Sequence, residues 1–404
     1  MQHPPAEPIG SAFSFDDLRR YPDVEAANLF ASDAADRLIL DTAAPALAAS
    51  APGETIVIGD HYGALTLGAA ALHGVRGLRV HQDPLAGERA LANNASGLGL
   101  GDAYVSLGLG AELLEGARIV LLQLPRSLDA LDEIAEAIAR FAATDVAIYA
   151  GGMVKHLTIA MNDVLGRHFG EVRASRARQK ARVLTVSSAG RVTSTSAGRV
   201  TSSEAARVSR PLDVAPTWPR REFHADRDLW VWAHGAAFAG TKIDIGTRLL
   251  LEVLGQARPD AASAIDLGCG TGVIAAALAK ARPEITVLAT DQSAGAVASA
   301  RATMTANGLA DRVTVVRDDA LSARPDASAG LILLNPPFHI GAAVHAGGAL
   351  KLFGDAARVL EPGGELWTVW NSHLAYKAAL SRLVGPTRQV TRNAKFTVTV
   401  STRR

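Results

Sequence analysis

The stretch Ile265-Asp-Leu-Gly-Cys-Gly-Thr-Gly272 decides the fold of this 404-residue chain. An apolar run from Ala261 to Leu267 leads into three glycines at alternate positions, and helix-forming residues follow from Val273 to Ala281. This pattern predicts a buried strand, a tight turn and a helix. Such a turn brings the backbone close to a ligand and points N–H groups at it. The glycine spacing differs from the Gly-x-Gly-x-x-Gly of dinucleotide sites, so it indicates a different nucleoside ligand.

The residues after this turn alternate between apolar runs and helical patterns. They predict an α/β domain with a parallel, doubly wound sheet, which binds ligands at the carboxyl ends of its strands. The expected strands are 285–290, 313–317, 331–334, 365–369 and 395–400, and the expected helices are 294–307, 353–360 and 377–383.

A second motif, Leu333-Leu-Asn-Pro-Pro-Phe-His339, ends one of these strands. An exocyclic amine on a base is a poor nucleophile because its lone pair is delocalised into the ring. The Asn335 side-chain oxygen and the Pro336 carbonyl suit its two hydrogens, Pro337 stiffens the turn, and Phe338 offers a face for stacking. Catalysis would then rest on orientation and on stabilising positive charge at nitrogen. Together the motifs predict methyl transfer from S-adenosylmethionine to a nitrogen of a base or amide.

Three carboxylates suit the cofactor. Asp266 would pair with its cationic amino-acid end, Asp291 would accept both ribose hydroxyls, and Asp319 would accept from the adenine amino group, with Asp318 as an alternative. Each of these residues also suits a helix cap or a turn, and His339 suits either substrate contact or a cap. The expected cofactor site is completed by Gly268, Gly270 and Gly272.

The chain repeats itself at an offset near 209 residues. Gly59 corresponds to Gly268, Asp83 to Asp291, and Leu121-Leu-Gln-Leu-Pro125 to the strand that ends in Asn335. Two α/β halves of one class follow. The first copy replaces Thr271 by a tyrosine and lacks Asn-Pro-Pro, so we expect it to have lost its polar chemistry. The prediction is two tandem Rossmann-like class I methyltransferase domains with a degenerate N-terminal copy.

Charge is distributed unevenly although the net charge is only +1. Residues 167–221 carry 12 Lys/Arg and 3 Asp/Glu, and residues 377–404 carry seven basic residues and no acid. Local basic stretches on a near-neutral protein are typical of a nucleic-acid footprint, although a solvated linker and tail would look the same. The residues predicted to bind RNA are Arg173, Arg176, Arg178, Lys180, Arg182 and Lys395.

The duplicated pattern and a repeat rich in Ser, Gly and Arg between its copies give the predicted domains. These are residues 1–186, a degenerate methyltransferase-like domain for RNA positioning; residues 187–215, a flexible linker; and residues 216–404, the catalytic domain. Cys269 is the only cysteine, which excludes an internal disulfide and a Cys-based metal cluster. We expect no metal, no membrane span and a cytoplasmic protein, since no apolar run approaches the ~20 residues that cross a bilayer.

The second half resembles the bacterial ribosomal RNA guanine-N2 methyltransferases, namely the C-type enzymes of the small subunit and their G-type relatives of the large subunit. The resemblance rests on residues 238–250, 266–272, 291–294, 306–308 and 335–339. It extends over nearly the whole chain, because those families also carry a degenerate first copy. It implies transfer from S-adenosylmethionine to N2 of a guanine in ribosomal RNA, most readily the small-subunit 16S RNA, with the RNA or the ribosomal subunit as partner. It adds Gln292 and Thr247 to the cofactor site.

Two other functions stay open from the sequence. A protein-glutamine or adenine-N6 methyltransferase would have a similar pocket, although those enzymes more often carry Tyr in place of Phe338. A non-catalytic ribosomal RNA-binding assembly factor would carry a vestigial site, against which the intact Asp266, glycine turn and Asn335-Pro-Pro argue.

Overall fold

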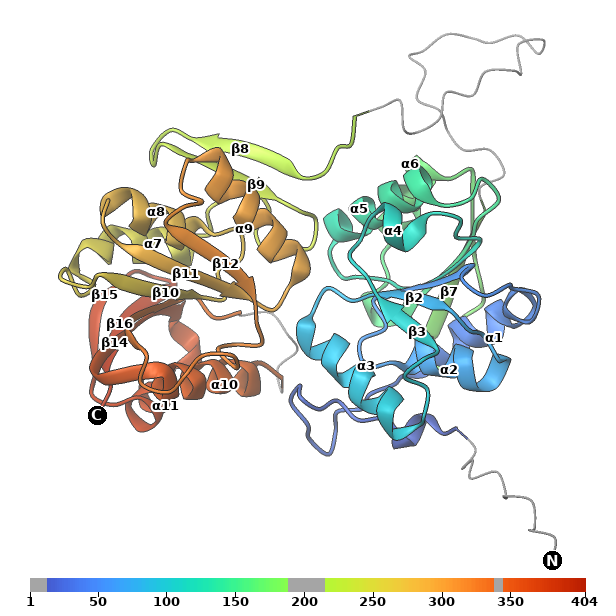
Figure 1. Cartoon of the computed structure of the whole chain (residues 1–404), viewed down its shortest axis with the longest axis horizontal. Helices are drawn as coiled ribbons and strands as arrows, with labels where there is room; N and C mark the ends of the chain where they lie inside the picture. The colour runs from blue at the N-terminus through green and yellow to red at the C-terminus, as the bar shows by residue number, and fades with distance from the viewer. Residues whose placement is uncertain (1–12, 188–214, 338–343) are drawn as a thin grey trace, which may run out of the picture.

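The computed structural model describes residues 13–187, 215–337 and 344–404. They form two α/β bodies that lie side by side, each built on a seven-stranded sheet (Figure 1). The strand order is β3-β2-β1-β4-β5-β7-β6 in the first sheet and β12-β11-β10-β13-β14-β16-β15 in the second. In both sheets the last two strands of the order run antiparallel to their neighbours, and the others are parallel. The two halves therefore share one topology, which confirms the predicted tandem α/β fold.

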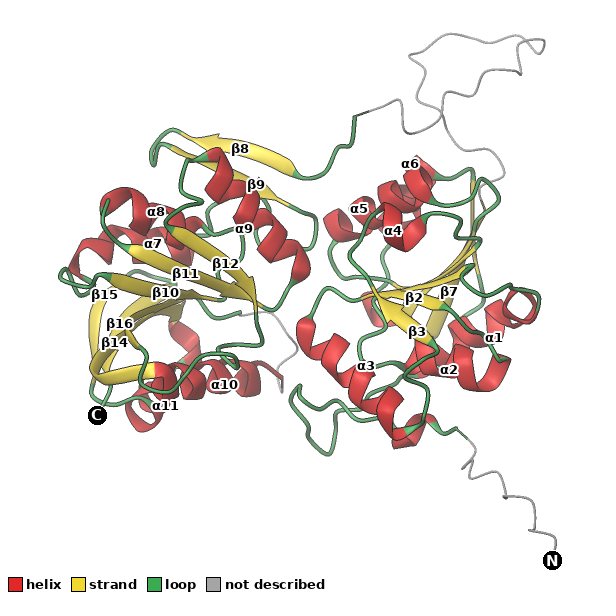
Figure 2. Ribbon diagram, in the orientation of Figure 1, coloured by secondary structure: helices red, strands yellow, loops and turns green. Residues whose placement is uncertain are grey.

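In the first half, helices cover both faces of the sheet (Figure 2). One face carries α1 (Ala34–Ala48), α2 (Ala64–His73) and α3 (Leu85–Gly97), and the other carries α4 (Ala111–Leu114), α5 (Leu128–Phe141) and α6 (Ile159–His168). The strands are β1 (Thr55–Ile58), β2 (Leu78–His81), β3 (Tyr104–Ser106), β4 (Ile119–Gln123), β5 (Ala147–Met153), β6 (Glu171–Ala174) and β7 (Ala181–Ser187).

The second half begins with a hairpin, β8 (Arg220–His224) and β9 (Leu229–Ala233), which packs along α9. One face of its sheet carries α7 (Ile245–Val253), α8 (Val273–Ala281) and α9 (Ala294–Ala306), and the other carries α10 (Val344–Val359) and α11 (Lys377–Leu383). The strands are β10 (Ser263–Leu267), β11 (Thr286–Asp291), β12 (Val313–Arg317), β13 (Ala329–Leu334), β14 (Leu360–Asn371), β15 (Thr387–Arg392) and β16 (Phe396–Thr402).

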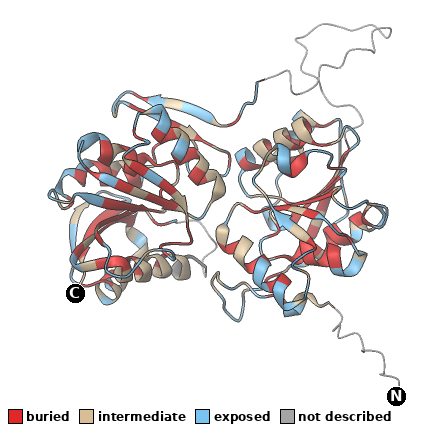
Figure 3. Cartoon of the chain, in the orientation of Figure 1, coloured by how far each residue is buried: buried red, intermediate tan, exposed pale blue. Residues whose placement is uncertain are grey.

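The central strands of both sheets are buried on both faces (Figure 3). Branched aliphatic residues are the most frequent in these strands, as expected for parallel strands covered by helices on either side. Trp367 of β14 and Phe353 of α10 are fully buried on opposite faces of the second sheet. Among the described residues, no helix is long and apolar enough to cross a membrane.

Local sequence patterns located most elements of the second half. The expected bounds are confirmed for α8, α11 and β12, and several others shift by one or two residues. Two differ more. The helix expected to start at residue 353 starts at Val344, because Gly347, Gly348 and Gly354 weaken the helical signal. The strand expected at 365–369 runs from Leu360, because Leu360 pairs with Ala329 before the register shifts and pairing resumes at Glu365.

The predicted linker, residues 187–215, lies almost wholly outside the described residues. The domain boundaries on either side of it stay predictions.

Candidate functional site

The glycine turn joins β10 to α8 at the carboxyl edge of the second sheet. Gly268, Gly270 and Gly272 have φ angles of 69°, 54° and 79°, a left-handed region that glycine adopts without steric cost. A Cβ on Gly268 or Gly270 would meet nothing within 4 Å, whereas one on Gly272 would lie 2.7 Å from Cε of Met304. The first two glycines therefore face open space where a ligand can approach the backbone.

Asp266 lies beneath this turn and is completely buried. Its Oδ2 accepts a hydrogen bond from the backbone N–H of Ala275 at 2.9 Å, which ties β10 to the first turn of α8. Its Oδ1 has no partner among the described residues. Burial, with a smaller contribution from the charge of Asp291, raises the pKa of Asp266 to about 7. One oxygen of Asp266 is therefore unpaired beneath the turn, and its role toward the cofactor stays a prediction.

Asp291 ends β11 and braces the same turn. Its Oδ2 accepts from Gly270 N and its Oδ1 from Ser293 N, both at 2.9 Å. Burial raises the pKa of this carboxyl. Gln292 is exposed beside it. The carboxylate predicted to accept the ribose hydroxyls thus also holds the glycine turn in shape.

The two aspartates after β12 have different partners. Asp318 accepts from Ser322 Oγ at 2.6 Å and from Ala323 N at 3.0 Å, so it closes a turn. Both carboxylate oxygens of Asp319 accept from Nζ of Lys351 at 2.6 Å. The structure thus gives the turn-forming role to Asp318. Asp319, the first choice for the adenine contact, faces α10.

Asn335 follows β13 on the same edge. Its Nδ2 donates to Thr247 Oγ1 at 2.9 Å and to Asp244 Oδ2 at 3.3 Å. Asp244 is the N-cap of α7 and also accepts from Gly246 N at 2.9 Å. Asn335 Oδ1 is buried and has no partner among the described residues. The amide is therefore anchored through its nitrogen, and its oxygen is left as an acceptor.

The rest of this motif is only partly described. Pro336 is buried and Pro337 is exposed, whereas Phe338 and His339 lie outside the described residues. The contact between Asn335 and Thr247, 88 positions apart, was not predicted. The signal available for it was Asp244 at a helix start, with Thr247 on the first turn of that helix.

The sheet brings the predicted cofactor residues together. The strands β12, β11, β10 and β13 are neighbours in that order, and the turns after them carry Asp319, Asp291, the three glycines and Asn335. No group of three or more His, Cys, Asp or Glu side chains in the described part of the chain is placed to hold a metal ion.

The residues predicted to bind RNA lie elsewhere. Arg173 is on β6 and Arg182 on β7 of the first half, and the other three lie on or beside the turn between these strands. Two of the five already have acidic partners: Arg173 pairs with Glu171, and Arg178 with Asp41. Lys395 is exposed in the turn before β16 of the second half. Their role in RNA binding stays a prediction.

The first half repeats the glycine turn in its backbone. Gly59, His61 and Gly63 have φ angles of 75°, 55° and 103°, at the positions of Gly268, Gly270 and Gly272. The chain itself covers this turn. The ring of Tyr62 lies under the guanidinium of Arg20, with 4.5 Å from Cζ to the ring centroid, and its hydroxyl donates to Asp23 Oδ2 at 2.5 Å.

The first half also retains a version of the Asn335 contact. Gln123, at the end of β4, is in the position that corresponds to Asn335 after β13. The Nε2 of Gln123 donates to Asp36 Oδ1 at 2.6 Å. Asp36 lies three residues after Asp33, the N-cap of α1, as Thr247 lies three residues after Asp244. The first copy thus carries polar groups at the corresponding positions, and they bind each other; its degeneracy stays a prediction.

The two halves meet at the amino ends of α3 and α9. Leu85 N donates to Gln292 O and Ala294 N donates to Asp83 O, both at 2.9 Å. Strand pairing and helix starts place Gln82, not Asp83, at the position of Asp291, so that correspondence was wrong by one residue. Asp83 instead reaches the other half, where its Oδ1 accepts from Ser293 Oγ at 2.9 Å and from Gly295 N at 2.8 Å.

A second contact of this junction involves the end of β12. Arg317 donates to Glu88 Oε2 at 2.7 Å and to the carbonyls of Gln82 and Asp83 at 2.9 and 3.1 Å. Asp319 follows two residues later. The first half therefore holds the backbone next to both carboxylates predicted to bind the nucleoside.

Strand order, glycine turn and acidic strand ends define a class I, S-adenosylmethionine-dependent methyltransferase. Residues 228–400 match the methyltransferase small domain family and residues 9–190 match the RLMG N-terminal domain family. The chain belongs to the ribosomal RNA large subunit methyltransferase G family. It is 33% identical over 388 residues to the Streptomyces avermitilis member, covering 94% of this chain and 95% of that one. It is 35% identical over 384 residues to the Pseudomonas paraeruginosa member, covering 95% and 96%.

A solved structure shares the fold of both halves. The Thermus thermophilus 16S rRNA N2 G1207 methyltransferase, in complex with AdoMet and guanosine, matches with a TM-score of 0.67 at 21% identity, over 94% of this chain and 97% of that one. The tandem arrangement of two methyltransferase folds is thus shared by both chains.

The junction predicts that the first half affects cofactor affinity. Replacing Asp83 by Ala or Glu88 by Gln should raise the Kd for S-adenosylmethionine about tenfold, since each change removes a hydrogen bond to a charged group that holds the site's backbone. Calorimetric titration measures this Kd. The matched control is Glu133→Gln, because Glu133 also joins the halves, through His234 and Gly235, without touching the turns after β11 or β12. If Glu133→Gln raised the Kd by the same factor, the effect would come from a general weakening of the contact between the halves and not from the turns after β11 and β12.

Asp36 predicts a pH dependence of stability. Its pKa is raised to about 8, first by burial and then by the charge of Asp33. A carboxyl whose pKa is higher in the folded than in the unfolded chain stabilises the fold fully below its unfolded pKa, and this stability is lost as pH rises through the folded value. The stabilising contribution of Asp36 should therefore decline between about pH 4 and pH 8. In urea unfolding of the full chain, Asp36→Asn should make the free energy of unfolding decline less steeply over this pH range. The same pH dependence in the variant and the unchanged protein would contradict the raised pKa of Asp36.

Proposed function

We propose that this chain transfers the methyl group of S-adenosylmethionine to the N2 amine of a guanine in ribosomal RNA. The observation that carries the proposal is the amide of Asn335, with its nitrogen fixed by Thr247 and Asp244 and its buried oxygen unpaired. Such an oxygen suits an amine hydrogen, since a buried acceptor without a partner costs about 1–3 kcal/mol until it finds one. The family assignment to ribosomal RNA methyltransferases supports the RNA substrate.

The residues present fit the cofactor. The open left-handed turn, Asp266 Oδ1 and Asp291 offer backbone donors and acceptors of the kind that its amino-acid end and ribose need. When bound, the cofactor supplies an electrophilic methyl group. Asn335 Oδ1 and the carbonyl of Pro336 would accept the two amine hydrogens and turn the nitrogen lone pair toward that methyl. The proton released from the amine can pass to water, so no side chain with a strongly shifted pKa is needed for this step.

The choice between small-subunit and large-subunit ribosomal RNA as the substrate depends on the similar proteins. The sequence alone favoured the small-subunit RNA. The curated relatives cover nearly the whole chain and are named for the large subunit, whereas the small-subunit enzyme is similar at 21% identity, which supports the fold alone. We therefore take large-subunit RNA as the substrate. An enzyme with this substrate would work in the cytoplasm, where ribosomes are assembled.

The first half is proposed to be non-catalytic. The covered turn at Tyr62 and the pairing of Gln123 with Asp36 support this role, because the groups that would meet a cofactor or an amine already bind each other. Its remaining tasks would be to position RNA, through the basic β6–β7 region, and to support the cofactor site.

Product analysis tests the proposal. The full chain is incubated with labelled S-adenosylmethionine and, in separate reactions, with each ribosomal subunit and each naked ribosomal RNA, and the RNA is digested to nucleosides. Label should appear as N2-methylguanosine from large-subunit RNA. Label in N6-methyladenosine or methylglutamine would replace the proposed substrate, N2-methylguanosine from small-subunit RNA would move the target to that RNA, and cofactor binding without any product would favour an assembly factor.

Asn335→Ala tests the mechanism. Turnover should fall by about 10²–10³, the scale of losing one transition-state hydrogen bond, while the Kd for S-adenosylmethionine stays close to that of the unchanged protein. Steady-state kinetics with ribosomal RNA and calorimetry give the two values. Gln123→Ala is the control at the corresponding position of the first half, and it should keep its turnover. Near-normal turnover of the Asn335 variant would refute the role of this side chain.

A further inference from the structure

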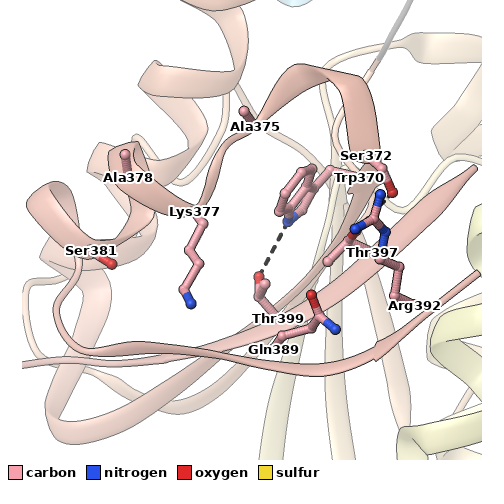
Figure 4. A pocket seen from close by; sticks show the side chains of 10 residues that line it. All are labelled: Trp370, Ser372, Ala375, Lys377, Ala378, Ser381, Gln389, Arg392, Thr397 and Thr399. Carbon is pink, nitrogen blue, oxygen red and sulfur yellow. Dashed lines mark hydrogen bonds between the residues drawn. The ribbon is translucent and has the colours of Figure 1, made fainter.

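A groove of about 520 Å³ lies beside the catalytic turn in the second half (Figure 4). It opens between α11 and the three antiparallel strands at the edge of the sheet. Its walls come from the ends of β14 and β15, from β16 and from the first turns of α11. The side chains that carry the argument are Trp370, Ser372, Lys377, Gln389 and Arg392.

The groove is basic and its cations are free. Lys377 comes from the start of α11 and Arg392 from the end of β15, on opposite sides of the groove. Within the described part of the chain, neither side chain makes an ion pair or a hydrogen bond, and no acidic residue lines the groove. In the β6–β7 region, by contrast, Arg173 and Arg178 are paired with carboxylates. Two unneutralised cations facing one hollow favour an anionic ligand.

A β-bulge brings Arg392 into the groove. In β15, Gln389 pairs with Thr399, Thr391 with Val398 and Arg392 with Thr397, so β15 has one more residue than its partner here. Successive side chains of a strand point to opposite faces, so without this extra residue Arg392 would share the face of Arg388. The bulge reverses this, and Arg392 points to the same side as Gln389.

Neutral hydrogen-bonding groups surround the cations. Trp370 is 5% exposed and its indole N–H donates to Thr399 Oγ1 at 3.3 Å. The hydroxyl groups of Ser372 and Thr397 lie 2.8 Å apart and bond each other. The amide of Gln389 is exposed. Hydroxyl and amide groups beside Lys and Arg are the usual partners of phosphate and sugar oxygens in nucleic-acid sites.

The groove lies on the catalytic edge of the sheet. Leu334, just before Asn335, pairs with Thr368, and Trp370 follows two residues later in the parallel strand β14. With neighbouring strands about 5 Å apart, the groove over β14, β16 and β15 lies roughly 5–15 Å from the strand of Asn335. A nucleic acid whose base enters the site at Asn335 would have its adjoining backbone within this range.

We propose that this groove binds a phosphodiester of the RNA strand that carries the target guanine. Lys377 and Arg392 neutralise the phosphate from either side, and Gln389 and Ser372 contact its oxygens or the adjoining ribose. The inference rests on the proposed function, because it takes ribosomal RNA as the substrate. It adds a site that fixes the strand next to the flipped or looped base.

RNA binding by the full chain tests this inference. The double variant Lys377→Gln/Arg392→Gln should bind large-subunit ribosomal RNA about tenfold more weakly, and the slope of log affinity against log salt should fall by about one for each cation removed. The Kd for S-adenosylmethionine should not change. The matched control is Arg388→Gln, which removes an exposed cation from the opposite face of β15 and should leave the RNA affinity close to that of the unchanged chain.

A second variant tests the inference independently, in case the double variant folds poorly. Gln389→Glu keeps both cations and puts a carboxylate between them at an exposed position, and it should weaken RNA binding while the melting temperature stays unchanged. Unchanged RNA affinity and salt slope in both variants would overturn the inference, and so would tight binding of inorganic phosphate together with unchanged RNA binding. Failure of the proposed function has a separate signature, the absence of N2-methylguanosine from reactions of the unchanged chain.

Discussion

The hydrogen bonds from Asn335 to the start of α7 are the constraint on which the site depends. An unrestrained amide could present either its nitrogen or its oxygen to a ligand. Here the nitrogen is committed to Thr247 and Asp244, so the oxygen is the atom of this amide that remains unpaired. Asp244 accepts from Asn335 and also caps α7. One carboxylate therefore holds both the start of this helix and the orientation of the Asn335 amide. The glycine turn and the acidic strand ends lie on the same edge of the sheet as that oxygen.

The first half shows what happens when the same framework is kept and the groups change. Asp33, Asp36 and Gln123 stand where Asp244, Thr247 and Asn335 stand in the second half. A longer amide and a carboxyl in place of a hydroxyl let Gln123 reach Asp36, and burial then favours the protonated form of that carboxyl. The framework has thus remained, and its polar groups bind each other.

Local patterns in the sequence were enough to predict the fold and to name residues that the structure brings to one edge of the second sheet. The glycine spacing, the apolar run from Ala261 to Leu267 and the helix-forming residues after it are encoded over a few residues each, so α8 and its turn were predicted correctly. The contacts that orient the site are not local. Asn335 meets Thr247 from 88 positions away, and Asp83 meets Ser293 from 210 positions away. The bulge in β15 was equally hidden, because it depends on pairing with β16 and not on the residues of β15 alone.

The junction between the halves has one more consequence. Pro84 and Ser293, the N-caps of α3 and α9, form an antiparallel bridge, and the hydrogen bonds on either side of it are exchanged between corresponding positions, Leu85 with Gln292 and Ala294 with Asp83. When residue i of one copy contacts residue j of the other and j contacts i in return, the contact is isologous and has two-fold symmetry. At this bridge the two halves of one chain therefore meet as the two protomers of an isologous dimer would. Because both partners of this contact belong to one chain, it forms without the association step that two separate protomers would need.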